Sequence, residues 1–218
     1  MNGQGAPNPR DLLSRFSETT TQLLLQKAKD AILRRGELLM RQGQPSDYVF
    51  LVVSGGLLLF RADQDGAEVA LDLLGDGGLC GVEDILCDRP YGLSARATTK
   101  TTCYSIPSDV IRDIIKTDAS AAMAIANYVA VRLRLAERHM EILALENTPH
   151  RIESVLRRLA RRSHSRGMDL RLPLTQGDLA SLVGISRQSV NRNLRDLRVR
   201  GIVTSHPRHI AVSAALFS

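Results

Sequence analysis

The stretch from Leu174 to Val203 constrains the fold most, because it holds two short helical patterns separated by a single glycine. Thr175 is a typical N-cap for the first pattern. Gly184 supplies the turn, where a residue without Cβ takes positive φ at little cost. The apolar positions of the first pattern recur at helical spacing: Leu179, Ala180, Leu182 and Val183. We therefore expect a helix, a tight turn and a second helix.

The second helix of this stretch has one apolar side and one basic side. Ser186 caps it and Gly201 ends it, with Val190, Leu194 and Leu197 on the apolar side. The other side carries guanidinium, amide and hydroxyl groups, namely Arg187, Gln188, Ser189, Asn191, Arg192, Arg195 and Arg198. Such donors and acceptors meet base edges in the major groove of DNA. The plainer alternative is a helical hairpin with a solvated basic face.

The distribution of charge favours the first interpretation. Residues 148–218 contain 13 arginines, no lysine and 4 acidic residues, a net charge of +9. Residues 1–147 contain 16 basic and 19 acidic residues, a net charge of −3. A basic C-terminal part beside a slightly acidic N-terminal part is typical of nucleic-acid binding. Arginine also suits bidentate contact with phosphate or guanine.

Other classes find little support in the composition. The sequence has no apolar run long enough to cross a bilayer, and the start MNGQGAPNPR lacks the apolar core of a secretory signal. We therefore expect a cytoplasmic protein that does not bind membranes. Cys80, Cys87 and Cys103 are too few for a disulfide framework and lack metal-ligand spacing. We find no catalytic pattern either, and so do not expect an enzyme.

The N-terminal half changes its pattern along the chain. Residues 11–31 predict short amphipathic helices, with Leu12, Leu13, Phe16, Leu23, Leu24 and Leu25 on the apolar side. Residues 32–106 alternate short apolar runs with glycines, which is typical of a compact antiparallel barrel or sandwich. The segment DYVFLVVSGGLLLF predicts a hairpin with a Gly-Gly turn.

A long helix is expected from about Ala119 to Leu145. One apolar stripe has the spacing of a coiled-coil seam and contains Ala126, Val129, Leu133, Ala136, Met140 and Leu143. A second stripe contains Tyr128, Val131, Leu135, Ile142 and Leu145. Two stripes imply two partners, which we take to be the barrel and a second copy of the helix. The alternative is one wide stripe packed within a single monomer.

Asn147-Thr148-Pro149 breaks the long helix and begins another, because proline is tolerated in the first turn. A polar loop, SHSRGMD, follows at residues 163–169. The segment IVTSHPRHIAV predicts two short strands around His206-Pro207-Arg208, a wing whose Arg208 and His209 reach phosphate. We expect a sensor domain at 1–118, a dimerisation helix at 119–147 and a DNA-binding domain at 148–218.

This order of elements, together with RQGQPSDYVFLVVSGGLLLF and DLASLVGISRQSVNRNLRDLRVRGIV, resembles the CRP/FNR family of bacterial transcription regulators. The resemblance implies an α+β fold with an N-terminal antiparallel β-roll, cupin-like and of the cyclic-nucleotide-binding type. A long dimerisation helix and a C-terminal winged helix-turn-helix follow. It also implies a homodimeric activator that binds a double-stranded DNA operator and RNA polymerase. An effector in the roll would reposition the two recognition helices.

The resemblance assigns roles to particular positions. The DNA-binding residues are Thr175, Ser186, Arg187, Gln188, Ser189, Asn191, Arg192, Arg195 and Arg208. The seam of the long helix forms the dimer interface. The effector pocket is lined by Gly81, Val82, Leu93, Ser94 and Ala136.

The pocket positions depart from those of cyclic-AMP receptors, which hold the cyclic phosphate with a Gly-Glu pair and an Arg-Ser pair. Here the matching pairs are Gly81-Val82 and Leu93-Ser94. Without the arginine, only backbone donors balance the phosphate charge. Ala136 and Glu137 stand where a receptor offers small hydroxyls to adenine. The sequence therefore argues against cyclic AMP.

Other cofactors of the family also fit poorly. The segment before Cys80 contains no cysteine, so the four-thiolate iron–sulfur cluster of FNR-type proteins cannot be assembled. The haem-binding branch places a histidine two residues after a thiolate, where this chain has Val82. Haem or thiol redox sensing at Cys80 stays open as an alternative. The plainer interpretation makes the cysteines small buried hydrophobic residues.

Three functional hypotheses follow. The first is a DNA-binding regulator whose roll senses a signal other than a cyclic nucleotide, or none, so that the small-molecule effector is left undetermined. The second is a regulatory roll that acts by protein contact with a vestigial C-terminal domain, against which the charge of +9 argues. The third, an enzyme, lacks any catalytic motif. Neither haem nor a metabolite is identified by the residues.

Overall fold

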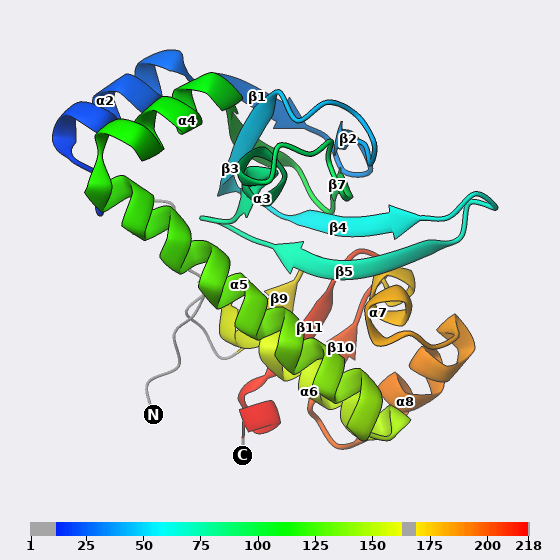
Figure 1. Ribbon diagram of the computed structural model, residues 1–218. Helices are drawn as coiled ribbons and strands as arrows, with labels where there is room; N and C mark the ends of the chain where they lie inside the picture. Colours follow the sequence, from blue (N-terminus) through cyan, green and yellow to red (C-terminus); the bar gives the residue numbers. More distant parts are fainter. Residues whose placement is uncertain (1–11, 163–168, 218) are drawn as a thin grey trace.

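The structure is a computed structural model that describes residues 12–162 and 169–217 (Figure 1). The N-terminal segment MNGQGAPNPR and residues 163–168 of the polar loop lie outside the described residues. A β-roll packs against the upper part of one long helix, and the C-terminal part of the chain lies beside the lower part of that helix. The α+β arrangement predicted from the sequence is confirmed.

The roll consists of two four-stranded antiparallel sheets. Their strand orders are β1-β8-β3-β6 and β2-β7-β4-β5. The strands are β1 (Lys29–Leu33), β2 (Leu38–Met40), β3 (Tyr48–Ser54), β4 (Leu57–Ala62), β5 (Glu68–Leu74), β6 (Leu79–Cys80), β7 (Ser94–Ala97) and β8 (Thr101–Pro107). A short helix, α3 (Val82–Leu86), follows β6. Since β5 is an edge strand, one row of its backbone donors and acceptors is free to pair with another element.

The predicted hairpin across Gly55-Gly56 is wrong. Strands β3 and β4 belong to different sheets, so the two glycines form a corner between sheets. Gly55 has a φ of +105°, and a Cβ there would lie 2.6 Å from the Lys100 carbonyl oxygen. The Gly56 N–H donates to the Thr101 hydroxyl at 3.1 Å, which joins the corner to the first residue of β8. The sequence pattern misled because apolar runs on both sides of a Gly-Gly pair suit either arrangement. The β-hairpin is formed instead by β4 and β5.

The N-terminal helical prediction is correct only in part. The helix α2 spans Glu18–Lys27 and is capped by the Ser17 side chain. Residues 29–31, predicted as helix, belong to β1 and pair with β8, because the sheet satisfies their backbone groups. Of the three consecutive leucines, Leu24 is buried, whereas Leu23 and Leu25 are exposed. Successive residues on a helix point about 100° apart, so three in a row cannot share one face.

The long helix is α5 (Ala119–Leu145), which follows α4 (Ser108–Thr117). The Asp118 side chain caps α5 by accepting from the backbone N–H groups of residues 120 and 121. Tyr128 is buried against the roll, and its hydroxyl donates to the Leu79 carbonyl at 2.9 Å and accepts from the Leu79 N–H at 2.6 Å. The second apolar stripe thus contacts the roll at Tyr128, although Leu145 in the same stripe is 82% exposed.

The described residues of the C-terminal part, 148–162 and 169–217, form three helices and a small sheet. They are α6 (Thr148–Arg162), α7 (Gln176–Val183), α8 (Arg187–Val199), β9 (Asp169–Leu172), β10 (Val203–Ser205) and β11 (Ile210–Ser213), followed by a 3-10 turn (Ala214–Phe217). The two predicted wing strands pair as β10 and β11. A third strand, β9, pairs with β11 and was missed, because residue 169 was assigned to the polar loop. Leu172 from this strand is 1% exposed, so the sheet buries an apolar residue of the missed strand.

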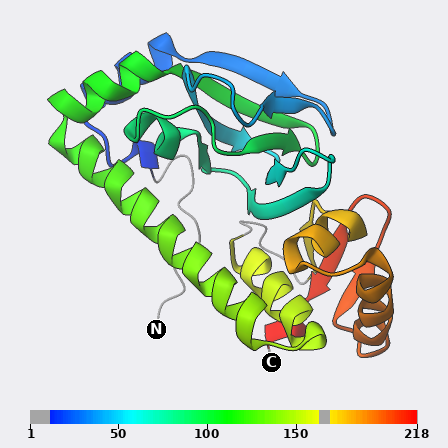
Figure 2. The same cartoon turned by 45° about the vertical axis from the view of Figure 1, so that its right-hand side comes forward.

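One hydrophobic cluster joins the β4–β5 hairpin of the roll to the C-terminal part. Leu58, Ala70 and Leu73 of the β4–β5 hairpin belong to the same cluster of buried residues as Leu179 and Leu182 of α7. Figure 2 shows α7 beside this hairpin and α8 further from the roll. The helix-turn-helix unit is therefore packed onto the roll through its first helix.

Candidate nucleic-acid interface and ligand pocket

The first helix of the helix-turn-helix is fixed by a capping box. The Thr175 hydroxyl oxygen accepts from the Asp178 N–H at 3.0 Å, and the Asp178 carboxylate accepts from the Thr175 N–H at 2.8 Å. At the other end, Gly184 has a φ of +69°, as predicted for the turn. These two local features set where α7 begins and ends, and hence where the next helix starts.

The helix α8 presents its polar side to solvent. Ser186 caps it, as predicted, by accepting from the Ser189 N–H at 3.1 Å. Its apolar residues Val190, Leu194 and Leu197 are buried. The exposed side chains form the surface that we call the α8 face: Arg187, Gln188, Asn191, Arg192, Arg195 and Arg198. Six long donors and amides on one exposed helix match what major-groove reading requires.

Three predicted contact residues are engaged in capping. The Thr175 hydroxyl donates to Asp178 at 2.7 Å. The hydroxyl oxygens of Ser186 and Ser189 lie 3.0 Å apart and share a hydrogen bond. The hydroxyl groups of these three residues stabilise the helix ends. Their backbone N–H groups, rather than their side chains, are therefore the groups that can contact phosphate.

The wing carries the remaining predicted residue, Arg208, which is exposed. The rings of His206 and His209 stack with centroids 4.4 Å apart. Burial together with the positive charge of His206 and Arg171 lowers the pKa of His209. The lowered pKa disfavours the protonated form of His209, whereas Arg208 of the wing carries a permanent positive charge.

A basic cleft beside the wing was missed by the sequence reasoning. It has a volume of about 370 Å³ and is lined by Arg35, Thr99, Lys100, Arg171, Pro173, Arg208 and His209. Arg35 of the lining donates to the Arg208 carbonyl at 3.0 Å. Arg35 and Lys100 come from the acidic half of the sequence, so a count of charge by segment could not reveal them.

The predicted effector-pocket residues occupy different environments. Gly81 and Val82 are buried at the start of α3, and Ser94 is buried at the start of β7. Leu93 is half-buried, whereas Ala136 lies exposed on α5. A Cβ at Gly81 would lie 2.8 Å from the Tyr91 ring, so that ring packs directly over the glycine. The Ser94 hydroxyl accepts from the Gln42 N–H at 3.0 Å.

A charged network lies beside this region and links three elements. Arg132 of α5 donates to Glu83 of α3 at 2.5 Å, and its other terminal nitrogen lies 3.8 Å from Asp72 of β5. Arg132 and Asp72 have side chains that are 16% and 14% exposed. Glu83, the residue after Val82, thus pairs with an arginine of the same chain.

The cysteines divide into two kinds. Cys80 and Cys103 are buried and Cys87 is exposed. Burial raises the pKa of the Cys80 thiol, and its sulfur donates to the Met40 sulfur at 3.6 Å. Burial also raises the pKa of Cys103 to about 12. Cys80 and Cys103 thus have the character of small apolar residues at neutral pH. The prediction that the cysteines are buried is wrong for Cys87.

Within residues 12–162 and 169–217, no cluster of three or more histidine, cysteine or acidic side chains is arranged to hold a metal ion. In the same residues, no helix combines the length and the apolar character needed to cross a bilayer.

Comparison with known proteins agrees with this geometry. Residues 32–118 match the family model of the cyclic nucleotide-binding domain, and residues 150–214 match that of the Crp-like helix-turn-helix domain. The chain is 30% identical over 181 residues to the cyclic AMP receptor protein of Thermus thermophilus, covering 83% of this chain and 82% of that protein. It is 29% identical over 182 residues to the CRP-like cAMP-activated global transcriptional regulator of Mycobacterium tuberculosis, covering 82% and 81%.

Solved structures share the fold. FixK2 from Bradyrhizobium japonicum superposes with a TM-score of 0.76 at 24% identity, covering 85% of this chain and 92% of that one. A CRP/FNR-family transcriptional regulator from Thermus thermophilus gives a TM-score of 0.70 at 22% identity, covering 87% and 96%. The chain therefore belongs to the CRP/FNR family of transcription regulators.

Proposed function

We propose that this regulator acts as a homodimer that binds an inverted-repeat DNA operator through two copies of α8. The observation that carries the proposal is the α8 face, six exposed donors and amides on a helix whose other side is buried. The wing and the basic cleft add arginines that contact phosphate without reading sequence. In keeping with its family, the bound dimer is proposed to act on RNA polymerase.

The exposed seam of α5 supports the dimer. Leu133 and Met140 are 59% and 61% exposed in the single chain. Apolar side chains at this spacing on one helix suit a second copy of the same helix. The proposed domains keep the predicted limits, with the sensor at 1–118, the dimerisation helix at 119–147 and the DNA-binding domain at 148–218.

The chemistry of α8 also suggests what it reads. Arginine donates two hydrogen bonds to O6 and N7 of guanine, so Arg192 should require a guanine in each half-site. Glutamine donates and accepts, which matches N6 and N7 of adenine, so Gln188 should favour an A·T pair. Arg187 lies at the start of the helix and is proposed to serve phosphate.

For the sensor we propose a signal other than a cyclic nucleotide, or none. The relatives from Thermus and Mycobacterium are named for cyclic AMP. In this chain, however, Val82 and Leu93 stand at the anchor positions and cannot pair with a phosphate or a ribose hydroxyl. Arg132 is engaged by Glu83, the residue that follows Val82. A cyclic phosphate would have to displace that carboxylate.

Two measurements test this function. Selection of sites from a random DNA pool should return an inverted repeat with a guanine in each half. Recovery of a non-repeated site, or of no enriched sequence, would contradict the proposal for DNA. Calorimetric titration with cyclic AMP and with cyclic GMP should give no saturable heat. Micromolar binding that also tightens binding to the selected DNA would contradict the proposal for the sensor.

A further inference from the structure

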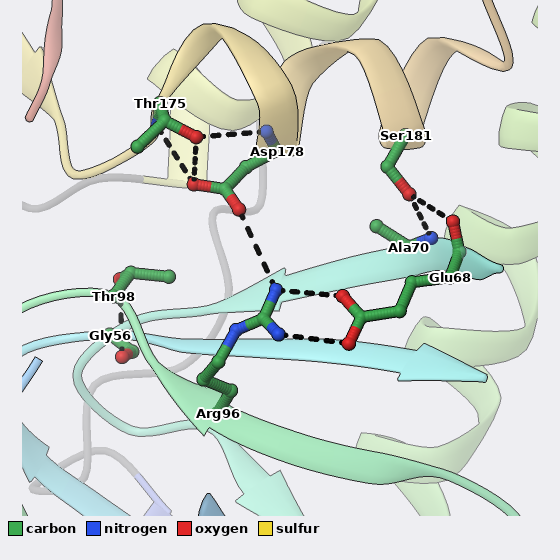
Figure 3. A network of polar contacts seen from close by, with 8 residues as sticks. All are labelled: Gly56, Glu68, Ala70, Arg96, Thr98, Thr175, Asp178 and Ser181. Carbon is green, nitrogen blue, oxygen red and sulfur yellow. Dashed lines mark hydrogen bonds and ion pairs between the residues drawn. The ribbon is translucent and has the colours of Figure 1, made fainter. Parts of the chain in front are cut away.

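The helix α7 is joined to the roll by polar contacts between residues far apart in the sequence (Figure 3). The Ser181 hydroxyl accepts from the Ala70 N–H at 2.7 Å and donates to the Glu68 carbonyl at 3.0 Å. Both backbone groups belong to the free edge of strand β5. One side chain of the helix-turn-helix thus satisfies a donor and an acceptor that would otherwise need water or another strand.

A salt bridge joins the same strand to β7. Arg96 of β7 pairs with both oxygens of the Glu68 carboxylate, each at 3.0 Å. The guanidinium also lies 4.7 Å from the centre of the Phe60 ring, which restricts its orientation. Paired and stacked in this way, Arg96 is pre-organised and loses little conformational entropy by making a further contact.

That further contact reaches the DNA-binding domain. Arg96 lies 3.9 Å from one oxygen of Asp178, whose other oxygen accepts the Thr175 N–H in the capping box of α7. Figure 3 shows Arg96 between the two carboxylates, Glu68 on β5 and Asp178 on α7. Asp178, the acidic member of the α7 capping box, is therefore also the residue through which a roll arginine approaches this helix. We call Glu68, Ala70, Arg96, Asp178 and Ser181 the α7–β5 clasp.

The clasp rests on an apolar contact that gives it a fixed geometry. Ala70 and Leu73 of β5 are 2% and 8% exposed and lie in the core cluster of the C-terminal part. Elements that share a closely packed interior do not slide freely against each other. None of the clasp residues comes from α8, and the α8 face stays exposed while the clasp is closed. A closed clasp thus leaves α8, the proposed reading helix, uncovered.

We propose that Ser181 and Arg96 are positioning residues that set the angle of the helix-turn-helix on the roll, and thereby the spacing between the two reading helices of the dimer. This inference rests on the proposed binding of a dimer to an inverted repeat. In such a dimer the long helices join the two rolls, so each reading helix is placed by its own roll. The clasp then determines which distance between half-sites the dimer accepts.

The test uses the full-length protein and a series of operators. Affinity is measured for inverted repeats with the selected spacing, with one base pair added and with one base pair removed. The variants are Ser181→Ala alone and Ser181→Ala combined with Arg96→Gln. Ser181→Thr keeps the hydroxyl as the conservative variant. Ser46→Ala is the matched control, because Ser46 makes a hydroxyl–carbonyl hydrogen bond of 2.7 Å within the roll. Hydrogen exchange at the Ala70 amide reports whether the clasp has opened.

Spacing discrimination is the ratio of the affinity for the selected spacing to the affinity for the altered spacings. We expect Ser181→Ala to lower this ratio by about three- to tenfold, which corresponds to the loss of one or two hydrogen bonds. The double variant should lose more. Base preference within each half-site should stay unchanged, because α8 is untouched. Ser181→Thr and Ser46→Ala should keep the discrimination of the unmodified chain. Ala70 exchange should be faster in Ser181→Ala and in the double variant only.

Other outcomes overturn the inference. If the double variant exchanges Ala70 faster but discriminates spacing as before, the clasp does not position the reading helix. If it binds every spacing more tightly with unchanged discrimination, the clasp restrains binding instead. If Ala70 exchange is the same in all variants, the edge of β5 is not held by Ser181. An unmodified chain that shows no preference for an inverted repeat would instead contradict the proposed function.

Discussion

Arg132 and Glu83 join the long helix α5 to the short helix α3 through a hydrogen bond of 2.5 Å between guanidinium and carboxylate. The Arg132 side chain is 16% exposed and that of Glu83 is 37% exposed. The pair lies between the sensor roll and the helix proposed for dimerisation. A change in the roll at α3 would therefore act directly on α5.

We expect Arg132→Met to lower the free energy of unfolding by about 1–3 kcal/mol, because it leaves the carboxylates of Glu83 and Asp72 without this cation. The lower half of that range is favoured, since solvent screens Glu83 in part. Urea denaturation measures the change. Arg138→Met is the matched control, because Arg138 pairs with Glu141 on an exposed surface. It should change stability by less than about 0.5 kcal/mol. Equal losses in the two variants would contradict this prediction.

Placing a charge at Leu133 should dissociate the dimer. Two-fold symmetry doubles the substitution, so Leu133→Asp brings two carboxylates into an apolar interface. Sedimentation should report a monomer, and binding to the inverted repeat should weaken by at least about tenfold. Asn127→Asp adds the same charge at an exposed position of α5 outside the seam and should leave the dimer intact. A Leu133→Asp protein that stays dimeric and binds the inverted repeat tightly would refute the assignment of the seam as the dimer interface.

Stability should fall as the pH is lowered, through His139. This residue is 6% exposed, and burial, aided by the positive charge of Arg158 and opposed by Asp72, lowers its pKa to about 4. The folded pKa lies below the unfolded value of about 6.5, so the unfolded state binds the proton first. The contribution is complete above about pH 6.5 and is lost as the pH falls toward about 4.

Denaturation at several pH values should show a loss of about 1–3 kcal/mol across that window. In His139→Gln, which cannot titrate, the loss should shrink. His150→Gln replaces an exposed histidine and should keep the pH dependence of the unmodified protein. Identical pH profiles for all three proteins would exclude His139 as the source.

One thiol of three should react quickly in the native protein. Cys87 is exposed, whereas Cys80 and Cys103 are buried with raised pKa values, and the thiolate is the reactive form. A thiol reagent at about pH 8 should therefore label one site per chain, and three after denaturation. Cys87→Ser should abolish the fast phase. Rapid labelling of Cys80 in the folded protein would instead favour the redox-sensor alternative.

The identity of residue 188 should set the base preference at one pair of each half-site. Glutamate only accepts hydrogen bonds, so Gln188→Glu should shift preference from A·T toward C·G by about 1–3 kcal/mol. Competition binding with single-base variants of the selected operator measures the shift. Gln22→Glu, an equal charge change at an exposed position of α2, should leave base preference unchanged. An undiminished C·G preference opposite the original Gln188 would contradict the assignment.

The helix-turn-helix could be predicted from the sequence because its signals are local. Thr175 and Ser186 cap helices with their own side chains, and Gly184 adopts the positive φ that its lack of Cβ permits. Each of these choices depends on residues only a few positions away. Helical spacing likewise separated the buried residues of α8 from its exposed face. The family resemblance added the order of the roll, the long helix and the wing.

Only the tertiary structure decided which segments pair and which charges meet. The apolar runs on either side of Gly55-Gly56 suited a hairpin, yet the two strands enter different sheets. Glu83 and Arg132 lie 49 residues apart in the chain, and Ser181 meets Ala70 across 111 residues. No local pattern encodes such contacts, because they depend on how whole elements pack. The sequence by itself therefore determined α8 and the chemistry of its exposed face, and only the packing of α7 on β5 decided how the helix-turn-helix is joined to the roll.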